Sequence, residues 1–299
     1  MTRPSIFIVG APKCGTTALY SYLKAHPDVF MSSLKEPQFF GEDLLGNRRN
    51  ICDWESYLAL FAAAKSQRAG EASTVYLGSP SAARRIKDFS PAAQILIMLR
   101  NPLEVMQAEH GVRILGGNEM IVDFESALAA DEQDQPCATP RHRRPWGMRY
   151  RELVRFAPQV TRYFRTFGSE RVHVIVYDDF KEDTAKAYGE TLGFLGLRAG
   201  FEPRLRPVNR YRRIRSMPLH RTLLAPPEAI RAVSHAVMSQ PMRRFVGNCI
   251  RRLNESVEPR PPLAEAASQQ LLAKLKREIA PDVDALSRLL NRDLSHWYS

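Results

Sequence analysis

Residues 6–17 of the chain read Ile6-Phe7-Ile8-Val9-Gly10-Ala11-Pro12-Lys13-Cys14-Gly15-Thr16-Thr17. The four residues before Gly10 are apolar, and such a short run bounded by glycine predicts a buried strand. A helix is expected from about Thr16, because Leu19, Tyr20 and Leu23 recur on one helical face. A buried strand that passes through a short loop into a helix is typical of a parallel α/β fold.

The loop between this strand and helix is suited to binding an anion. Free amide groups and the helix dipole favour negative charge where a strand enters a helix. Gly10 and Gly15 have the GxxxxG spacing of a nucleotide P-loop, but Thr16 stands where such loops carry their lysine. Lys13 is the lysine of this loop, and Thr16 and Thr17 add hydroxyl donors. We therefore predict an anion site, with a purely structural strand–loop–helix unit as the alternative.

Strands and helices alternate along the first two thirds of the chain. Apolar runs predict further strands at 29–31, 94–99 and 172–177, and helical patterns cover 54–61, 81–89, 103–115, 124–130 and 150–167. This order predicts an α/β protein of the three-layer P-loop type, with a central parallel sheet and helices on both faces. Ligands of such folds bind beyond the carboxyl ends of the strands. Neither an internal repeat nor a low-complexity linker divides the chain, so we expect a single domain, 1–299.

The last third has a different character. Residues 203–221 are arginine-rich and irregular, 227–254 form a basic amphipathic helical pattern, and 258–262 are a proline-rich break. We expect 200–262 to be a basic lid over substrate or nucleotide, with its apolar side chains packed and its basic face solvated. Membrane attachment of 227–254 is the less favoured alternative. A final helix, 263–290, is expected to be interrupted at Pro281, and 263–299 form the C-terminal helices.

Composition excludes several classes of protein. The 299 residues are 44% hydrophobic and 25% charged, which is ordinary for a globular protein and excludes a disordered chain, a collagen-like fibre and a coiled-coil rod. The chain has no apolar run long enough for a transmembrane helix and no secretory signal, so a cytoplasmic location is expected. The four cysteines lie far apart without a CxxC pair, which argues against a disulfide framework or a zinc site and favours a metal-free protein.

The chain is strongly basic, with 43 Lys and Arg against 32 Asp and Glu and a formal net charge of +11. Arginines cluster at 204–221 and 141–151, which favours a cleft for an anion over a merely basic surface. Nucleic acid is not favoured as a partner, because neither a zinc-finger nor an aromatic RNA-binding pattern accompanies the charge.

The loop 12–17 resembles the 5′-phosphosulfate loop of sulfotransferases that use 3′-phosphoadenosine 5′-phosphosulfate (PAPS). Other stretches of the chain match that family in order. Residues 35–40, Lys-Glu-Pro-Gln-Phe-Phe, are similar to the KEPxFF segment of bacterial and heparan-sulfate-type members, and 70–77 are similar to the GE(A/K)SxxYL segment that follows it. Residues 99–102 resemble the strand end that opens the 3′-phosphate site, and 294–297 resemble the end of bacterial members. The resemblance implies sulfuryl transfer from PAPS, without a metal, to a hydroxyl or amine of a glycan, lipid or small molecule, leaving 3′-phosphoadenosine 5′-phosphate (PAP).

The resemblance also implies a donor site. Lys13 is expected beside the bridging oxygen of the donor, and the loop is expected to cradle the 5′-phosphate through Pro12, Lys13, Cys14, Gly15, Thr16 and Thr17. Cys14 is interpreted as a small residue that fits the loop. Arg100 is expected to bind the 3′-phosphate, because an unpaired arginine at the end of a buried strand is costly. Pairing of Arg100 with a carboxylate is the alternative.

Two further features of the sequence bear on how the 3′-phosphate would be bound. The family usually carries a serine eight residues after this arginine, but this chain has Ala108 there. Loss of one charge-assisted hydrogen bond costs on the order of 1.5–3 kcal/mol unless Gln107 or a backbone amide replaces it. Arg213 and Arg215 lie in a basic segment that resembles the part of bacterial members that closes over the nucleotide, and a solvated arginine run is the alternative.

The acceptor must lose a proton, and the resemblance implies Glu36 as the general base. From the residues alone, Glu71 is an equal candidate, and a capping or salt-bridged glutamate is the structural alternative. Lys35 is expected to orient acceptor or sulfuryl oxygens. His110 is the second candidate base, although a packed histidine is the more common arrangement at such a position.

Two other functions remain open from the sequence. A small-molecule kinase would need magnesium and the P-loop lysine that position 16 lacks. A non-catalytic nucleotide binder would tolerate replacement of Glu36. The sequence leaves the acceptor and the oligomeric state open.

Overall fold

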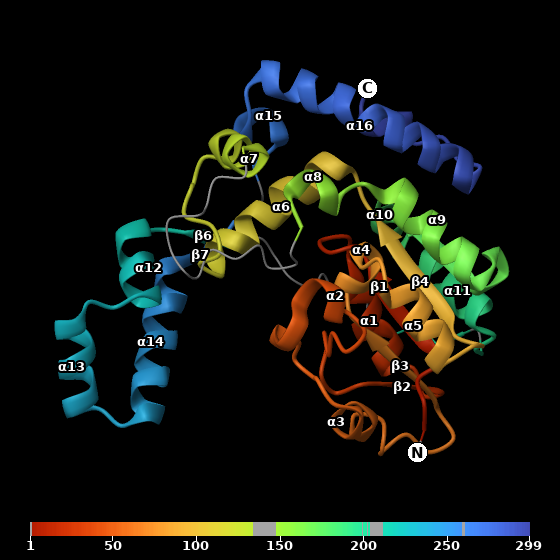
Figure 1. Ribbon diagram of the computed structural model, residues 1–299, viewed down its shortest axis with the longest axis horizontal. Coiled ribbons are helices and arrows are strands. Elements are labelled where there is room, and N and C mark those ends of the chain that lie inside the picture. The colour runs from red at the N-terminus through yellow and green to blue at the C-terminus, as the bar shows by residue number, and fades with distance from the viewer. Residues whose placement is uncertain (1, 134–147, 199, 202, 204–211, 259–260) are drawn as a thin grey trace. The chain divides into compact units, whose positions relative to one another are not determined.

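The computed structural model describes residues 2–133, 148–198, 200–201, 203, 212–258 and 261–299 (Figure 1). The chain divides into two compact units. The first, which we call the core unit, comprises 1–109, 146–208 and 268–299, and the second unit comprises 110–145 and 209–267. The predicted basic stretch at 141–144 and the arginines at 204–210 lie outside the described residues.

The core unit is built on a five-stranded sheet with the strand order β2-β3-β1-β4-β5. The strands are β1 (Ile6–Gly10), β2 (Val29–Met31), β3 (Arg68–Ala72), β4 (Gln94–Leu99) and β5 (Val172–Val176). Every neighbouring pair is parallel. All five residues of β1 are buried, as expected of a strand that is covered on both faces. The predicted α/β fold is confirmed.

Helices cover both faces of this sheet (Figure 1). The rings of Tyr22 in α1 (Thr16–Ala25) and Tyr188 in α11 (Thr184–Leu195) pack edge to face, with their centres 6.1 Å apart. Tyr163 of α9 (Phe156–Phe167) donates its hydroxyl proton to the carbonyl of Tyr76 at 2.8 Å. The helices of the core unit are α1 (Thr16–Ala25), α2 (Glu42–Leu45), η1 (Gly46–Arg48), α3 (Trp54–Ala59), α4 (Val75–Gly78), α5 (Ala82–Phe89), α8 (Tyr150–Leu153), α9 (Phe156–Phe167), η2 (Ser169–Arg171), α10 (Tyr177–Glu182), α11 (Thr184–Leu195), α16 (Gln269–Leu290) and η3 (Ser295–Trp297), and α6 (Pro102–Leu115) runs from this unit into the second.

Strand β3 was not among the predicted strands. Its sequence, Arg-Ala-Gly-Glu-Ala, lacks the apolar run of a buried strand, yet four of its five residues are buried. Gly70 is needed because a Cβ there would lie 2.8 Å from Met31 Sδ and 3.0 Å from Ile6 Cβ. Arg68 is satisfied by Leu195 O and by Gln94 Oε1, the latter at 2.7 Å. Close packing between neighbours, rather than hydrophobicity, therefore places this strand.

Because the strands are parallel, their carboxyl ends share one edge of the sheet. The phosphate loop follows β1, Lys35 and Glu36 follow β2, and Ser73 follows β3. Arg100 follows β4 and Tyr177 follows β5. The fold thus gathers segments that are distant in sequence at the edge where α/β folds bind ligands.

The second unit contains α7 (Phe124–Glu132), β6 (Arg212–Ile214), α12 (Met217–Leu224), α13 (Glu228–Val237), α14 (Gln240–Asn254), β7 (Glu255–Val257) and α15 (Leu263–Ala266). Strands β6 and β7 pair antiparallel, with Arg213 opposite Ser256. The prediction of irregular structure over 203–221 is therefore wrong for β6 and α12. A three-residue strand paired with a partner more than forty positions away leaves no periodic signal in the sequence.

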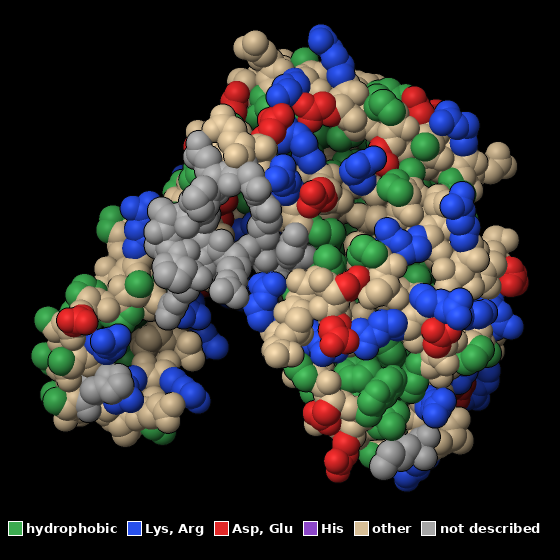
Figure 2. Space-filling model, viewed as in Figure 1, with side chains coloured by type: hydrophobic (Ala, Val, Ile, Leu, Met, Phe, Trp, Pro, Cys, Tyr) green, Lys and Arg blue, Asp and Glu red, His purple; other side chains and the backbone are tan. Residues whose placement is uncertain are grey.

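Helices α13 and α14 expose large apolar side chains (Figure 2), although the sequence analysis predicted that these would be packed. The exposed side chains are Ile230, Val233 and Val237 on α13 and Met242, Phe245 and Leu253 on α14. The prediction of packing is wrong for these residues. None of the described helices is long and apolar enough to cross a membrane.

Helix α16 runs without interruption through Pro281, contrary to the prediction. The break comes earlier, where Ser268 caps α16 by accepting the amide of Leu271 at 3.1 Å. A proline removes one backbone hydrogen bond, and burial of Leu275, Ile279, Val283 and Leu286 along the same helix compensates for that loss.

Candidate active site

At two glycines of the phosphate loop, the backbone packs closely against neighbouring side chains. Gly15 has a left-handed φ of 93° and precedes α1, and a Cβ there would lie 3.1 Å from Met98 Cε and from the ring of Tyr177. A Cβ at Gly10 would lie 2.5 Å from Leu77 Cβ. Gly15 provides no side-chain cap for α1, and the first amide groups of a helix without such a cap suit an anion.

Cys14 and Lys13 occupy the centre of this loop. Cys14 is fully buried, and its thiol donates to Pro12 O at 3.4 Å. Burial raises the pKa of the thiol, and the positive charges of Arg100 and Lys13 oppose that shift only in part. Cys14 is therefore a protonated thiol that packs as a small apolar residue. Lys13 is half-buried and, like Gly15, has a left-handed backbone, with φ 65°.

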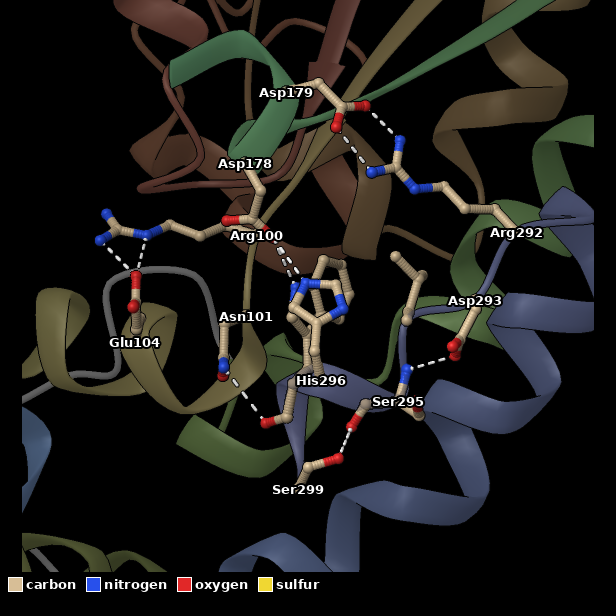
Figure 3. A network of polar contacts seen from close by, with 12 residues as sticks. Arg100, Asn101, Glu104, Asp178, Asp179, Arg292, Asp293, Ser295, His296 and Ser299 are labelled. Atoms are coloured by element: carbon tan, nitrogen blue, oxygen red, sulfur yellow. Dashed lines mark hydrogen bonds and ion pairs between the residues drawn. The ribbon is translucent and has the colours of Figure 1, made fainter. Parts of the chain in front are cut away.

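Arg100 follows β4 directly and is paired with a carboxylate (Figure 3), as the alternative prediction had it. Its Nε donates to Glu104 Oε2 at 2.5 Å, and its guanidinium lies 4.7 Å from the centre of the Tyr177 ring. Glu104 belongs to the first turn of α6 and its side chain is 40% exposed, against 18% for Arg100. The pair leaves Glu104 accessible to exchange, so a stronger anion can replace it on Arg100.

The C-terminal segment docks beside Arg100 (Figure 3). Asp178 Oδ2 accepts the indole N–H of Trp297 at 2.8 Å and lies 3.1 Å from His296 Nε2. Asn101 donates its side-chain amide to Trp297 O at 3.1 Å. Residues 295–297 are thereby attached to the segments that follow β4 and β5. The sequence indicated 294–297, and 99–102 with Asn101, by resemblance alone, and gave no sign of Asp178.

Glu36 lies between Lys35 and the segment after β3. Its carboxylate accepts from Lys35 Nζ at 2.8 Å, from the amide of Thr74 at 2.9 Å and from the Thr74 hydroxyl at 3.0 Å. The carbonyl of Thr74 in turn lies 3.2 Å from where a Cβ on Gly10 would stand. Thr74 therefore connects Glu36 with the phosphate loop, and the side chain of Glu36 remains 21% exposed.

Left-handed backbone conformations gather in these two loops. Among the described non-glycine residues, a positive φ occurs at Lys13, Glu36, Gln38 and Asn291, and Asn291 is the C-cap of α16. Such conformations are costly for residues with a Cβ and persist where the surrounding structure holds them. Their concentration at Lys13 and Glu36 is typical of a functional site.

Glu71, the alternative base, is fully buried within β3. It accepts hydroxyl protons from Tyr57 at 2.6 Å, Ser73 at 2.8 Å and Tyr76 at 3.1 Å. Burial raises the pKa of the Glu71 carboxyl to about 7, and the three hydroxyl hydrogen bonds oppose that shift. A carboxylate with no exposed surface cannot reach an acceptor, which leaves Glu36 as the accessible carboxylate of the two.

His110 is 5% exposed, and its Nε2 lies 2.8 Å from Ile121 O. Burial lowers the pKa of the imidazole. This is the packed arrangement that the sequence analysis weighed against a catalytic role. His110 belongs to the second unit and not to the unit that carries Glu36.

The remaining residues predicted to contact the donor are Ala108 on α6, Arg213 on β6 and Arg215 directly after β6. Ala108 is buried within α6, where backbone amides serve the helix. Arg213 lies 3.7 Å from Glu258, and Arg215 donates to Leu253 O at 3.4 Å, and both side chains are exposed. Arg213 and Arg215 belong to the second unit, so their role toward a nucleotide stays a prediction.

The site thus combines a glycine loop at a helix start with cations and a carboxylate at the carboxyl edge of a parallel sheet, an arrangement suited to holding an anionic group. The chain belongs to the sulfotransferase domain family, whose model matches residues 3–218. This confirms the resemblance noted in the sequence.

Individual relatives agree with this assignment. Carbohydrate sulfotransferase 15 of Rattus norvegicus is 28% identical over 167 residues, which are 42% of this chain and 30% of that protein. Bifunctional heparan sulfate N-deacetylase/N-sulfotransferase 1 of Caenorhabditis elegans is 32% identical over 137 residues, 41% of this chain and 15% of that protein. The matched regions thus span less than a third of these curated relatives. The crystal structure of a sulfotransferase from Alicyclobacillus acidocaldarius has a TM-score of 0.70 and 29% identity, with 100% of both chains covered.

Proposed function

We propose that this protein transfers a sulfuryl group from PAPS to a hydroxyl or amine of its acceptor, with Glu36 as general base. The observation that carries the proposal is the position of Glu36, which Thr74 connects to the phosphate loop while its carboxylate stays accessible. A base must reach the acceptor proton, and the donor must be held beside it.

The residues present fit the donor. Gly15 lies so close to Met98 and Tyr177 that a side chain would not fit, so backbone amides approach the 5′-phosphate directly. Lys13 supplies positive charge where the leaving phosphate develops negative charge. Arg100 binds the 3′-phosphate in exchange for Glu104, because a phosphate carries more charge than one carboxylate.

The transfer conserves atoms and charge in one in-line step. The bond between sulfur and the bridging phosphate oxygen breaks as the acceptor oxygen or nitrogen bonds to sulfur. The acceptor proton passes to the Glu36 carboxylate, and PAP leaves with the negative charge that Lys13 offsets. Lys35, which donates to Glu36 at 2.8 Å, orients that carboxylate. We propose that the step needs no metal ion.

Glycans are the first acceptor class to test. The names of two relatives refer to a carbohydrate and to heparan sulfate. A basic protein also suits an acidic acceptor, and the net charge here is +11.

Thermal unfolding with PAP, beside ADP and ATP with magnesium, tests the donor. A ligand at a hundred times its dissociation constant adds about 2.7 kcal/mol of stability. We expect PAP to stabilise the wild type, and Lys13→Ala and Arg100→Ala to lose that response. Arg84→Ala is a matched control, because Arg84 is exposed on α5 and pairs with Asp88. Stabilisation by ATP with magnesium, and none by PAP, would favour a kinase and contradict the proposal.

A further inference from the structure

Glu71 is buried, and three hydroxyl groups donate hydrogen bonds to its carboxyl group. Tyr57 comes from α3, Ser73 follows β3 and Tyr76 belongs to α4. Each hydroxyl has a single proton, and each gives it to the Glu71 carboxylate. The oxygen lone pairs of Ser73 and Tyr76 are therefore left to accept from elsewhere.

Those two oxygens accept from the backbone of the 36–40 segment. The amide of Gln38 donates to Ser73 Oγ at 3.0 Å, and the amide of Phe40 donates to the Tyr76 hydroxyl at 3.3 Å. The Glu71 carboxyl thus fixes the direction of both hydroxyls, because a hydroxyl turned away from it would leave a buried carboxyl oxygen without that donor.

The 36–40 segment needs such support. Glu36 and Gln38 both have φ 62°, on either side of Pro37. A residue before proline is restricted to extended conformations, so Glu36 adopts a backbone that it rarely occupies. Contacts from other elements complete the clamp: Glu36 N donates to Ala72 O at 2.8 Å, and Asn50 donates to Glu36 O at 2.8 Å.

We propose that Glu71 is a positioning residue that holds the Glu36 carboxylate in its catalytic place through the hydroxyls of Ser73 and Tyr76. The inference rests on the proposed role of Glu36 as base. Glu71 itself touches neither donor nor acceptor, because it is fully buried.

Tyr57 provides a matched control. It donates to the same carboxylate from a buried position, and its ring stacks on Phe39 at 4.5 Å. Tyr57→Phe keeps that ring contact. Within the described part of the chain, its hydroxyl makes no hydrogen bond to the backbone of 36–40, unlike the hydroxyls of Ser73 and Tyr76. Removal of any of the three hydroxyls takes one hydrogen bond from the Glu71 carboxyl. Only removal of the Ser73 or the Tyr76 hydroxyl also takes a hydrogen bond from the backbone of 36–40.

The experiment compares Ser73→Ala, Tyr76→Phe and Tyr57→Phe at saturating donor. We expect Ser73→Ala and Tyr76→Phe to lower kcat at least about tenfold, because a small displacement of a reacting group is costly. Both should keep the thermal shift with PAP. Tyr57→Phe should keep kcat within about a factor of two and lose only stability. Equal losses of kcat in all three variants, or none in Ser73→Ala and Tyr76→Phe, would overturn the inference.

A rescue and a double variant exclude a merely structural effect. Ser73→Thr keeps the hydroxyl and should restore kcat relative to Ser73→Ala. Ser73→Ala in a Glu36→Gln background should lower kcat no further, because the hydroxyl acts through Glu36. Additive losses would contradict the inference. Glu36→Gln alone tests the base itself: if that variant keeps wild-type kcat, the proposed function fails at Glu36, whatever the hydroxyl variants do.

Discussion

The indole N–H of Trp297 donates to Asp178 Oδ2 at 2.8 Å, across 119 positions of sequence (Figure 3). Asp178 lies two residues after the end of β5, and Asn101, which follows β4, donates its side-chain amide to the carbonyl of Trp297 at 3.1 Å. The end of the chain is therefore part of the edge of the sheet that carries Arg100.

This docking predicts a large stability loss when Trp297 is removed. Trp297 is 2% exposed, so Trp297→Ala should lower the free energy of unfolding by about 3–5 kcal/mol. Trp297→Phe keeps much of the apolar contact and should cost less. Urea unfolding of both variants measures the difference, and equal, negligible losses would mean that the docked segment contributes little.

The buried carboxyl of Glu71 predicts a pH dependence of stability. Burial raises its pKa from the usual 4.5 to about 7. The folded state therefore holds this proton more tightly, and the resulting stability is complete below pH 4.5 and is lost as the pH rises to about 7. The shift corresponds to about 3 kcal/mol.

Glu71→Gln removes this titration. The free energy of unfolding of the wild type should fall relative to that of the variant between pH 4.5 and about 7, and the difference should be constant above that range. Urea unfolding at several pH values measures it. A difference that grows in the opposite direction would show that the carboxylate form is the one stabilised by folding.

Substitutions of Arg100 and of Glu104 should have opposite effects on the affinity for PAP. Glu104→Gln removes the carboxylate that occupies Arg100 in the free protein and should tighten PAP binding by about threefold to tenfold, up to about 1.4 kcal/mol. Arg100→Ala should weaken it. Calorimetric titration of PAP measures both, and weaker binding in Glu104→Gln would mean that Glu104 helps to hold the nucleotide.

The alanine at position 108 predicts that the wild type binds PAP less tightly than a variant with serine there. If the position faces the 3′-phosphate as the family resemblance implies, Ala108→Ser should strengthen PAP binding by on the order of 1.5–3 kcal/mol. Ala108→Gly, which adds no donor, is the control for an altered helix. The same titration applies, and unchanged affinity in Ala108→Ser would place this side chain away from the phosphate.

Local signals in the sequence predicted the framework of the fold and the exposed part of the site. Strands β1 and β4 are apolar on both faces, and the phosphate loop has its own spacing of glycine and lysine. The identity of Glu36 depended on family resemblance. In the structure, its 21% exposure and its contacts with Thr74, a residue 38 positions away, distinguish it from the buried Glu71.

What the sequence could not predict depends on pairing between distant segments. Strand β3 is defined by close packing at Gly70, and β6 by its pairing with β7. The hydroxyls on Glu71 come from three elements, and neither their convergence nor the hydrogen bond between Asp178 and Trp297 has a local pattern.

The most direct test of donor recognition compares the dissociation constants of PAP and adenosine 5′-monophosphate, which differ only in the 3′-phosphate. The account predicts that the wild type binds PAP at least about tenfold more tightly, equivalent to about 1.4 kcal/mol, and that Arg100→Ala loses this preference. Equal binding of the two nucleotides by the wild type would contradict a PAPS-dependent sulfotransferase.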